Sequence, residues 1–220
     1  MANVAAPLPR YEPRWAPALA IILVLGLLTA LPHHVQVMPM WVSYAVTLVI
    51  LIPMTAVTFS TRNVSFWLRA ERTVIILFAL GYVADTALEL ADMIGIITLH
   101  PPETRTISLL SSSLAIWVTN VLAFAMLYWQ MDRGGPAARK STENLPDWLF
   151  PQAATPEVAP PDWRPLFLDY LSLAFNTATA FSPTDVLPLT RRAKMLMIIE
   201  SGISLLTLVI VAARAVNVLA

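Results

Sequence analysis

Three acidic residues share one face of a predicted helix inside an otherwise apolar stretch. Asp85, Glu89 and Asp92 are spaced i, i+4 and i+7, which places them on one helix face. Acids within a membrane are costly, so they usually face a protein interior, where they mark an ion path or pair with a base. One interpretation is an ion pair of Asp92 or Glu89 with Arg214, which has a similar predicted depth at ~1.5 Å per helical residue. The other is a cation or proton site, for which Asp85 is the best candidate because it lies deepest.

A second polar group lies at the end of the apolar run over residues 166–182 and just after it. Its members are the hydroxyl residues and the acid Thr177, Thr179, Ser182, Thr184 and Asp185. If this segment conducts ions, the hydroxyls line the path, and the acid at its mouth favours cations. The alternative is a packed half-helix, in which hydroxyls bond to carbonyls of their own helix or pack between helices.

Few residues support an enzyme or a metal site. The chain has no Cys, no Gly-rich phosphate loop and no His in a loop predicted to be cytoplasmic, so a nucleophile has no evident base. His33, His34 and His100 have no carboxylate or Cys cluster beside them, so we expect no metal and no other cofactor. We expect no enzyme activity. The formal net charge of zero argues against nucleic acid as a partner.

The composition is that of an integral membrane protein. Hydrophobic residues make up 57% of the chain and charged residues 13%, with a mean hydropathy of +0.67, whereas soluble domains have about 25% charged residues. A membrane core of ~30 Å needs ~20 helical residues. Five apolar candidates run over about 15–31, 40–60, 73–99, 107–131 and 193–220. Aromatic residues near their ends predict an interfacial belt, and these are Trp15, Trp41, Tyr44, Tyr128 and Trp129.

The basic residues predict how these spans are oriented. All Lys and Arg residues except Arg105 and Arg214 fall in the N-terminal tail, the second connection and the fourth connection. The positive-inside rule makes that side cytoplasmic. We therefore expect a multi-pass membrane protein with its N-terminus in the cytoplasm and its C-terminus outside.

Residues 132–165 form the predicted soluble part of the chain. Several prolines and the pair Gly134-Gly135 exclude one continuous helix. Aromatic residues at 148, 150 and 163 are rarely all solvated, so we expect this linker to lie back on the membrane surface. A binding loop for a partner is the alternative.

The run over 166–182 is too short and too polar to span a membrane comfortably. Spanning would also place Arg191, Arg192 and Lys194 outside the cell. A re-entrant segment satisfies both constraints. The chain is thus expected to have three parts: a four-span region over 1–131, a Pro-rich cytoplasmic linker over 132–165, and a re-entrant segment with a final span over 166–220.

The part of the chain from residue 134 onward carries several short motifs. These are Gly134-Gly135-Pro136, Trp148-Leu149-Phe150-Pro151-Gln152, Trp163-Arg164-Pro165, Asp169-Tyr170-Leu171, the run Thr179 to Asp185, and Ala212-Ala213-Arg214-Ala215-Val216-Asn217. In these motifs the chain resembles an uncharacterised family of bacterial multi-pass membrane proteins. The resemblance implies a membrane protein and no particular chemistry, because the family brings no established activity.

The segment 179–185 also resembles the pore module of tetrameric potassium channels. Their filter reads Thr-Thr-Val-Gly-Tyr-Gly-Asp with a later proline, and Thr179, Asp185 and Pro188 match it. Ser182 and Thr184 replace the two glycines, whose backbone conformations a carbonyl filter needs. We therefore expect no potassium-selective filter. The predicted cytoplasmic side of the loop also differs from potassium channels, in which the loop enters from outside.

These observations predict an all-α integral membrane protein with five transmembrane helices and one re-entrant, pore-loop-like half-helix. The expected function is channel-like permeation of small inorganic ions. A homo-oligomer is expected, because one pore loop and one following helix cannot enclose a channel alone. The alternative is a non-conducting membrane scaffold or assembly protein that retains a pore-like fold.

Overall fold

The computed structural model describes residues 12–30, 40–59, 64–99, 106–139, 144–179 and 185–219. The described residues are mostly helical, which confirms the all-α class. The long helices are α1 (Trp15–Ala30), α2 (Met40–Phe59), α3 (Val64–Leu99), α4 (Thr106–Met131) and α7 (Arg191–Leu219). The shorter elements are η1 (Asp132–Gly134), β1 (Trp148–Leu149), α5 (Pro151–Ala154), α6 (Phe167–Thr179) and β2 (Leu187–Pro188).

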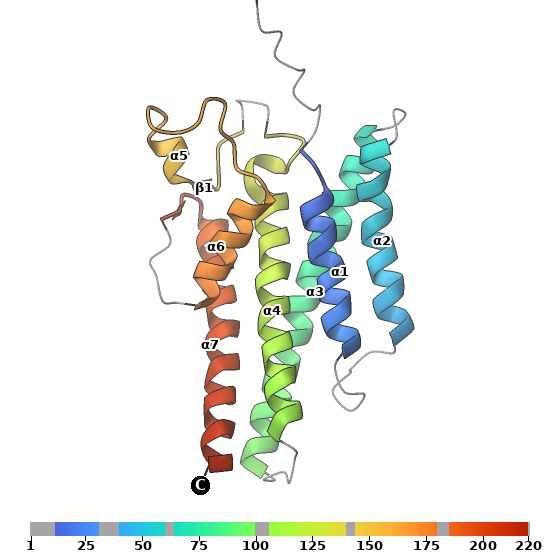
Figure 1. Cartoon of the computed structure of the whole chain (residues 1–220), viewed down its shortest axis with the longest axis vertical. Coiled ribbons are helices and arrows are strands. Elements are labelled where there is room, and N and C mark those ends of the chain that lie inside the picture. Colours follow the sequence, from blue (N-terminus) through green and yellow to red (C-terminus); the bar gives the residue numbers. More distant parts are fainter. Residues whose placement is uncertain are drawn as a thin grey trace, which may run out of the picture.

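Helix α4 lies at the centre of the bundle. It contacts α1, α3, α6 and α7, and Figure 1 shows α6 and α7 on one side of it and α1 on the other. Every side chain from Val121 to Gln130 is buried. The helix ends at Met131 and is followed by η1. The chain then turns at a pair of glycines with positive φ, 82° at Gly134 and 100° at Gly135, a conformation that glycine adopts at little cost.

Two described segments are long and apolar enough to cross a membrane, Leu114–Gly134 and Arg191–Ala212. Shorter apolar helices cover Trp15–Leu27 and Tyr44–Phe59. Large apolar side chains also cover the outward faces of α1, α2 and α7. Ile22, Leu48 and Leu205, one on each helix, are all more than half exposed. Soluble monomers rarely expose large continuous apolar surfaces, so these faces support a membrane location. The number of five spans stays a prediction.

Two of the linker aromatics, Trp148 and Phe150, are buried in the protein. The expectation that they lie on a membrane surface is therefore wrong. Their exposed fractions are 1% and 4%. The Trp148 ring lies 4.8 Å from the Tyr128 ring, and the Phe150 ring lies 5.3 Å from the Tyr170 ring, centroid to centroid. β1 pairs with β2 in antiparallel fashion, with Trp148 opposite Pro188. The strand pair and these ring contacts fold the linker onto the end of α4.

The aromatic belt is only partly as expected. Trp15, Trp41 and Tyr44 are exposed, as an interfacial position requires. Tyr128 and Trp129 are 0% exposed, so their assignment to the belt is wrong. Both find hydrogen-bond acceptors inside the protein, Glu200 for Tyr128 and Glu12 for Trp129, as buried Tyr and Trp usually do.

Candidate functional site

The half-helix α6 enters and leaves at the same end of the bundle. At its start, the Phe167 N–H donates to Glu12 Oε1 at 3.1 Å, and the Leu166 N–H donates to Asp169 Oδ2 at 2.7 Å. After α6 the chain returns to the linker, where β2 pairs with β1. Figure 1 shows α6 between α4 and the first part of α7, beside β1. The chain before α6 and the chain after it therefore meet at the same end of α7.

The inner end of α6 lies well inside the bundle. The Ser201 hydroxyl of α7 donates to the Thr177 carbonyl oxygen at 3.2 Å. Ser201 lies ~15 Å along the helix from Arg191, at ~1.5 Å per residue. If α7 spans a hydrocarbon core of ~30 Å, the inner end of α6 lies near its middle.

The hydroxyls of α6 are bonded within their own helix. Thr177 is buried, and its hydroxyl donates to the Leu173 carbonyl at 2.8 Å. The Thr179 hydroxyl donates to the Phe175 carbonyl at 3.0 Å and to the Asn176 carbonyl at 3.2 Å. Asp185 is exposed. The remaining pore-lining candidates, Ser182 and Thr184, lie outside the described residues.

A buried acid, Glu200, lies beside the inner end of α6. Its side chain is 0% exposed, and its Oε2 accepts a hydrogen bond of 2.5 Å from the Tyr128 hydroxyl of α4. Its Oε1 has no hydrogen-bond partner among the described residues. None of the ion pairs of the described residues includes Glu200. Among the described residues, therefore, no base balances a charge on this buried carboxyl.

The polar groups around Glu200 continue along α4 and α7. Asn120 Nδ2 of α4 donates to Ser204 Oγ at 2.9 Å and to the Glu200 carbonyl at 3.4 Å. Asn120 Oδ1 has no partner in the described structure. Glu200 stands within about two helical turns of Lys194, so the sequence favours a position near the predicted cytoplasmic boundary for it and no special role. The i, i+4, i+7 spacing of Glu200, Ser204 and Thr207 was the available signal, since it predicts one polar helix face.

Arg139 connects the start of α6 to the end of α4. Its Nη1 donates to Glu12 Oε2 at 2.7 Å, and its Nη2 donates to the Trp129 carbonyl. Trp129 Nε1 donates to the other carboxylate oxygen of Glu12 at 2.8 Å. The Glu12 carboxylate thus holds groups from three segments, which fixes where α6 begins.

A second buried pair, Arg14 and Glu71, joins the start of α1 to α3. Arg14 Nε and Nη2 each donate to Glu71 at 3.4 Å. Burial raises the pKa of the Glu71 carboxyl above its ordinary value, and the charge of Arg14 opposes part of this rise. Glu71 precedes the predicted span over 73–99, so this pair belongs to the end of the bundle.

The remaining predicted site residues are placed only by their backbone. Asp85, Glu89 and Asp92 lie in α3, and Arg214 lies in α7. Their side chains are outside the described part of the structure, so both interpretations of the acidic face stay predictions. The described residues contain no group of three or more metal-ligating side chains.

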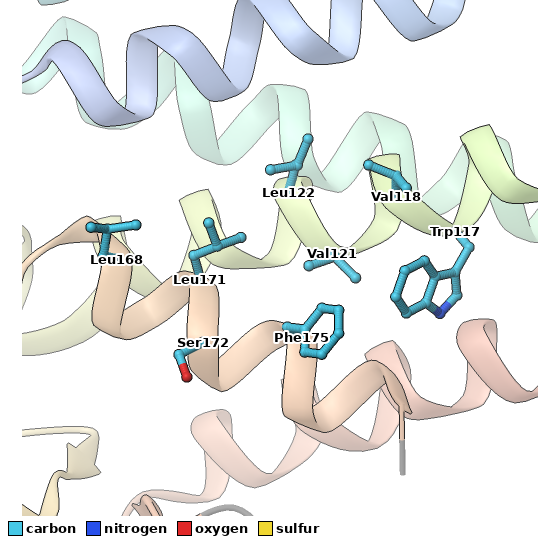
Figure 2. A pocket seen from close by; sticks show the side chains of 8 residues that line it. All are labelled: Trp117, Val118, Val121, Leu122, Leu168, Leu171, Ser172 and Phe175. Atoms are coloured by element: carbon cyan, nitrogen blue, oxygen red, sulfur yellow. The ribbon is translucent and has the colours of Figure 1, made fainter. Parts of the chain in front are cut away.

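An apolar pocket of about 410 Å³ lies between α4 and α6, which contact each other beside it. Figure 2 shows its lining, which comes from these two helices alone. The Trp117 and Phe175 rings meet edge to face at 5.7 Å. The Ser172 hydroxyl and the Trp117 N–H are the polar side-chain groups of this lining, so the pocket suits apolar groups and offers an ion almost no ligands.

No protein-family model, no curated protein and no solved structure matches this chain.

Proposed function

We propose that this chain forms a path for small inorganic ions across the bacterial inner membrane, as a homo-oligomer and without a potassium-selective filter. The observation that carries this proposal is the half-helix α6, which enters and leaves at one end of the bundle and is followed, after β2, by the long apolar helix α7. A broken helix at membrane depth is tolerated where it is buried in protein or lines a water-filled cavity.

The outward face of α7 supports an assembly of several copies. Ile198, Leu205 and Val209 are more than half exposed, so this face packs against lipid or against a neighbouring copy. One half-helix and one following helix cannot surround a path, whereas a symmetric ring of copies can.

One acid, Asp185, favours cations over anions along this path. Asp185 is exposed where the chain leaves the re-entrant segment. Acids that line a pore attract cations.

Ion flux through the purified protein in liposomes tests this proposal. We expect cation flux driven by the membrane potential. Asp185→Asn should move the reversal potential toward a lower cation preference. Glu157→Gln is the matched control, because Glu157 is also an exposed acid but belongs to the linker. Absence of flux at every voltage and pH would reject permeation.

A second candidate is a non-conducting membrane scaffold. The hydroxyls of Thr177 and Thr179 favour it, because their bonds to carbonyls of α6 hold them against their own helix, as in a packed half-helix. Under this alternative the protein folds and assembles normally, yet liposomes show no flux.

A further inference from the structure

A cavity of about 280 Å³ lies within the folded linker, at the end of α4. It is formed by η1, α5 and the loop that leads to α6. Its polar and aromatic lining includes Arg133, Arg139, Trp148, Gln152, Trp163 and Arg164. The cavity shares no lining residue with the half-helix α6, so it is a feature separate from the candidate ion path.

Four buried polar atoms of this lining have no hydrogen-bond partner among the described residues. Three are donors, namely Arg133 Nε, Arg139 Nε and Trp148 Nε1, and the fourth is the acceptor Gln152 Oε1. The Arg139 side chain is 4% exposed and Trp148 is 1% exposed. Buried polar groups are almost always paired, so a cluster of unpaired donors around one cavity indicates a missing acceptor.

The charges around the cavity favour an anion. Arg133 and Arg164 form no ion pair with any described acid, whereas Arg139 is paired with Glu12. Of the two lining acids, Asp132 accepts from the Tyr170 hydroxyl at 2.5 Å and from the Asp147 N–H at 2.8 Å, and Asp162 is exposed. Two guanidinium groups of the lining thus form no ion pair with a described acid. Guanidinium groups are well suited to planar carboxylate and phosphate oxygens.

The backbone around the cavity is held in an unusual conformation. Arg133 has a φ of 51° and Asp162 a φ of 58°, and among described residues other than glycine only these two have positive φ. Both line the cavity. Such residues are costly and cluster at ligand sites, where the surrounding structure holds them in place.

We propose that this cavity binds a small organic anion. Its phosphate or carboxylate oxygens accept hydrogen bonds from Arg133, Arg139 and Trp148. A hydroxyl or N–H group of the same molecule donates to Gln152 Oε1, and an apolar part packs on Phe150 and Trp163, which also line the cavity. The volume is close to the lower end of the range for small-molecule pockets, so the ligand is small.

Thermal unfolding of the full chain in detergent tests this site. The probes are inorganic phosphate, glycerol phosphate and acetate, each titrated at constant ionic strength against chloride. A ligand that binds the folded state alone raises Tm with concentration. We expect such a rise for at least one probe. We expect Arg133→Gln and Arg164→Gln each to raise the half-saturating concentration about tenfold or more, since the first removes a charged donor and the second removes a positive charge from the lining.

Arg191→Gln is the matched control, because Arg191 is an exposed arginine outside the cavity; it should leave the titration unchanged. A parallel arm adds phosphatidylglycerol to the micelles and distinguishes a lipid headgroup from a free anion as the source of the same oxygens. Stabilisation that depends on Arg133 or Arg164 in either arm supports the site and identifies its source. Equal titrations for the wild type and both variants, or no shift in either arm, would overturn it. Neither result depends on ion flux.

Discussion

Asp147 ties the linker to the start of α7. Its side chain is 0% exposed. Its Oδ1 accepts from the Thr190 hydroxyl and from Arg192 Nε, both at 2.6 Å, and its Oδ2 accepts from Arg192 Nη2 at 2.6 Å. Its backbone carbonyl accepts from the Leu189 N–H at 2.8 Å. One residue therefore fixes where the chain returns after the half-helix.

Asp147→Asn should destabilise the protein by about 2–3 kcal/mol, because it removes the charge from a buried, bidentate pair. The cost should be below that of breaking a fully buried pair, since the Arg192 side chain is 52% exposed and can turn to water. Denaturant unfolding in detergent measures it. Asp185→Asn, which changes an exposed acid, should cost almost nothing; equal losses in the two variants would contradict a special role for Asp147.

Glu71 should make stability depend on pH. Its folded pKa is raised, mainly by burial, so the folded protein holds this proton more tightly than the unfolded chain. The contribution is fully present below the ordinary pKa and is lost as the pH rises through the raised one. The wild type should therefore lose Tm relative to Glu71→Gln across this window. Glu157→Gln, at an exposed site, should track the wild type, and a constant wild-type to Glu71→Gln difference would show that Glu71 is not responsible.

At the scale of elements, the half-helix α6 is held between two longer helices. It packs on α4 and α7, and the Ser201 to Thr177 hydrogen bond joins its inner end to α7. The strand pair holds the returning chain beside the linker. If α7 spans the membrane, both ends of the α6 segment lie on the same side, which the basic residues predict to be cytoplasmic.

Cysteine labelling can check this topology cleanly, because the chain has no cysteine of its own. With a membrane-impermeant thiol reagent, Asp185→Cys should react only after the cells are permeabilised. Val158→Cys, at a linker site that is 79% exposed, should behave in the same way, whereas Arg105→Cys, in a predicted outer loop, should react in intact cells. Labelling of Asp185→Cys in intact cells, with Val158→Cys protected, would mean that the segment crosses the membrane.

At the scale of the whole molecule, the proposed ion path requires an assembly of several copies. We expect light scattering in detergent, corrected for bound detergent, to give a protein mass that is a multiple of the 24.2 kDa chain. Leu205→Trp should weaken the assembly, because a bulky ring disturbs helix packing at an interface. Leu48→Trp on α2 is the control, since Leu48 is similarly exposed but lies away from α7. A monomeric wild type would remove the basis for a path shared between copies.

Sequence patterns located most helices well, because helix position depends on runs of apolar residues that are local in the chain. The stretches expected over 40–60 and 107–131 correspond to α2 and α4, and the short run over 166–182 contains α6. The start of α3 was less accurate. It begins at Val64, ahead of the expected residue 73, because charged residues such as Arg69 and Glu71 end an apolar stretch without ending a helix.

The sequence alone determined the helical class, the approximate helix positions and the short half-helix, since these follow from residue type, spacing and the breaks at Pro and Gly. Only the tertiary structure decided which polar groups are buried. Glu200 and Tyr128 meet across two helices, Asp147 before α6 meets Arg192 after it, and the linker closes around a cavity. These contacts join residues far apart in the chain, so they depend on which helices pack together, and no local pattern of residues specifies that packing.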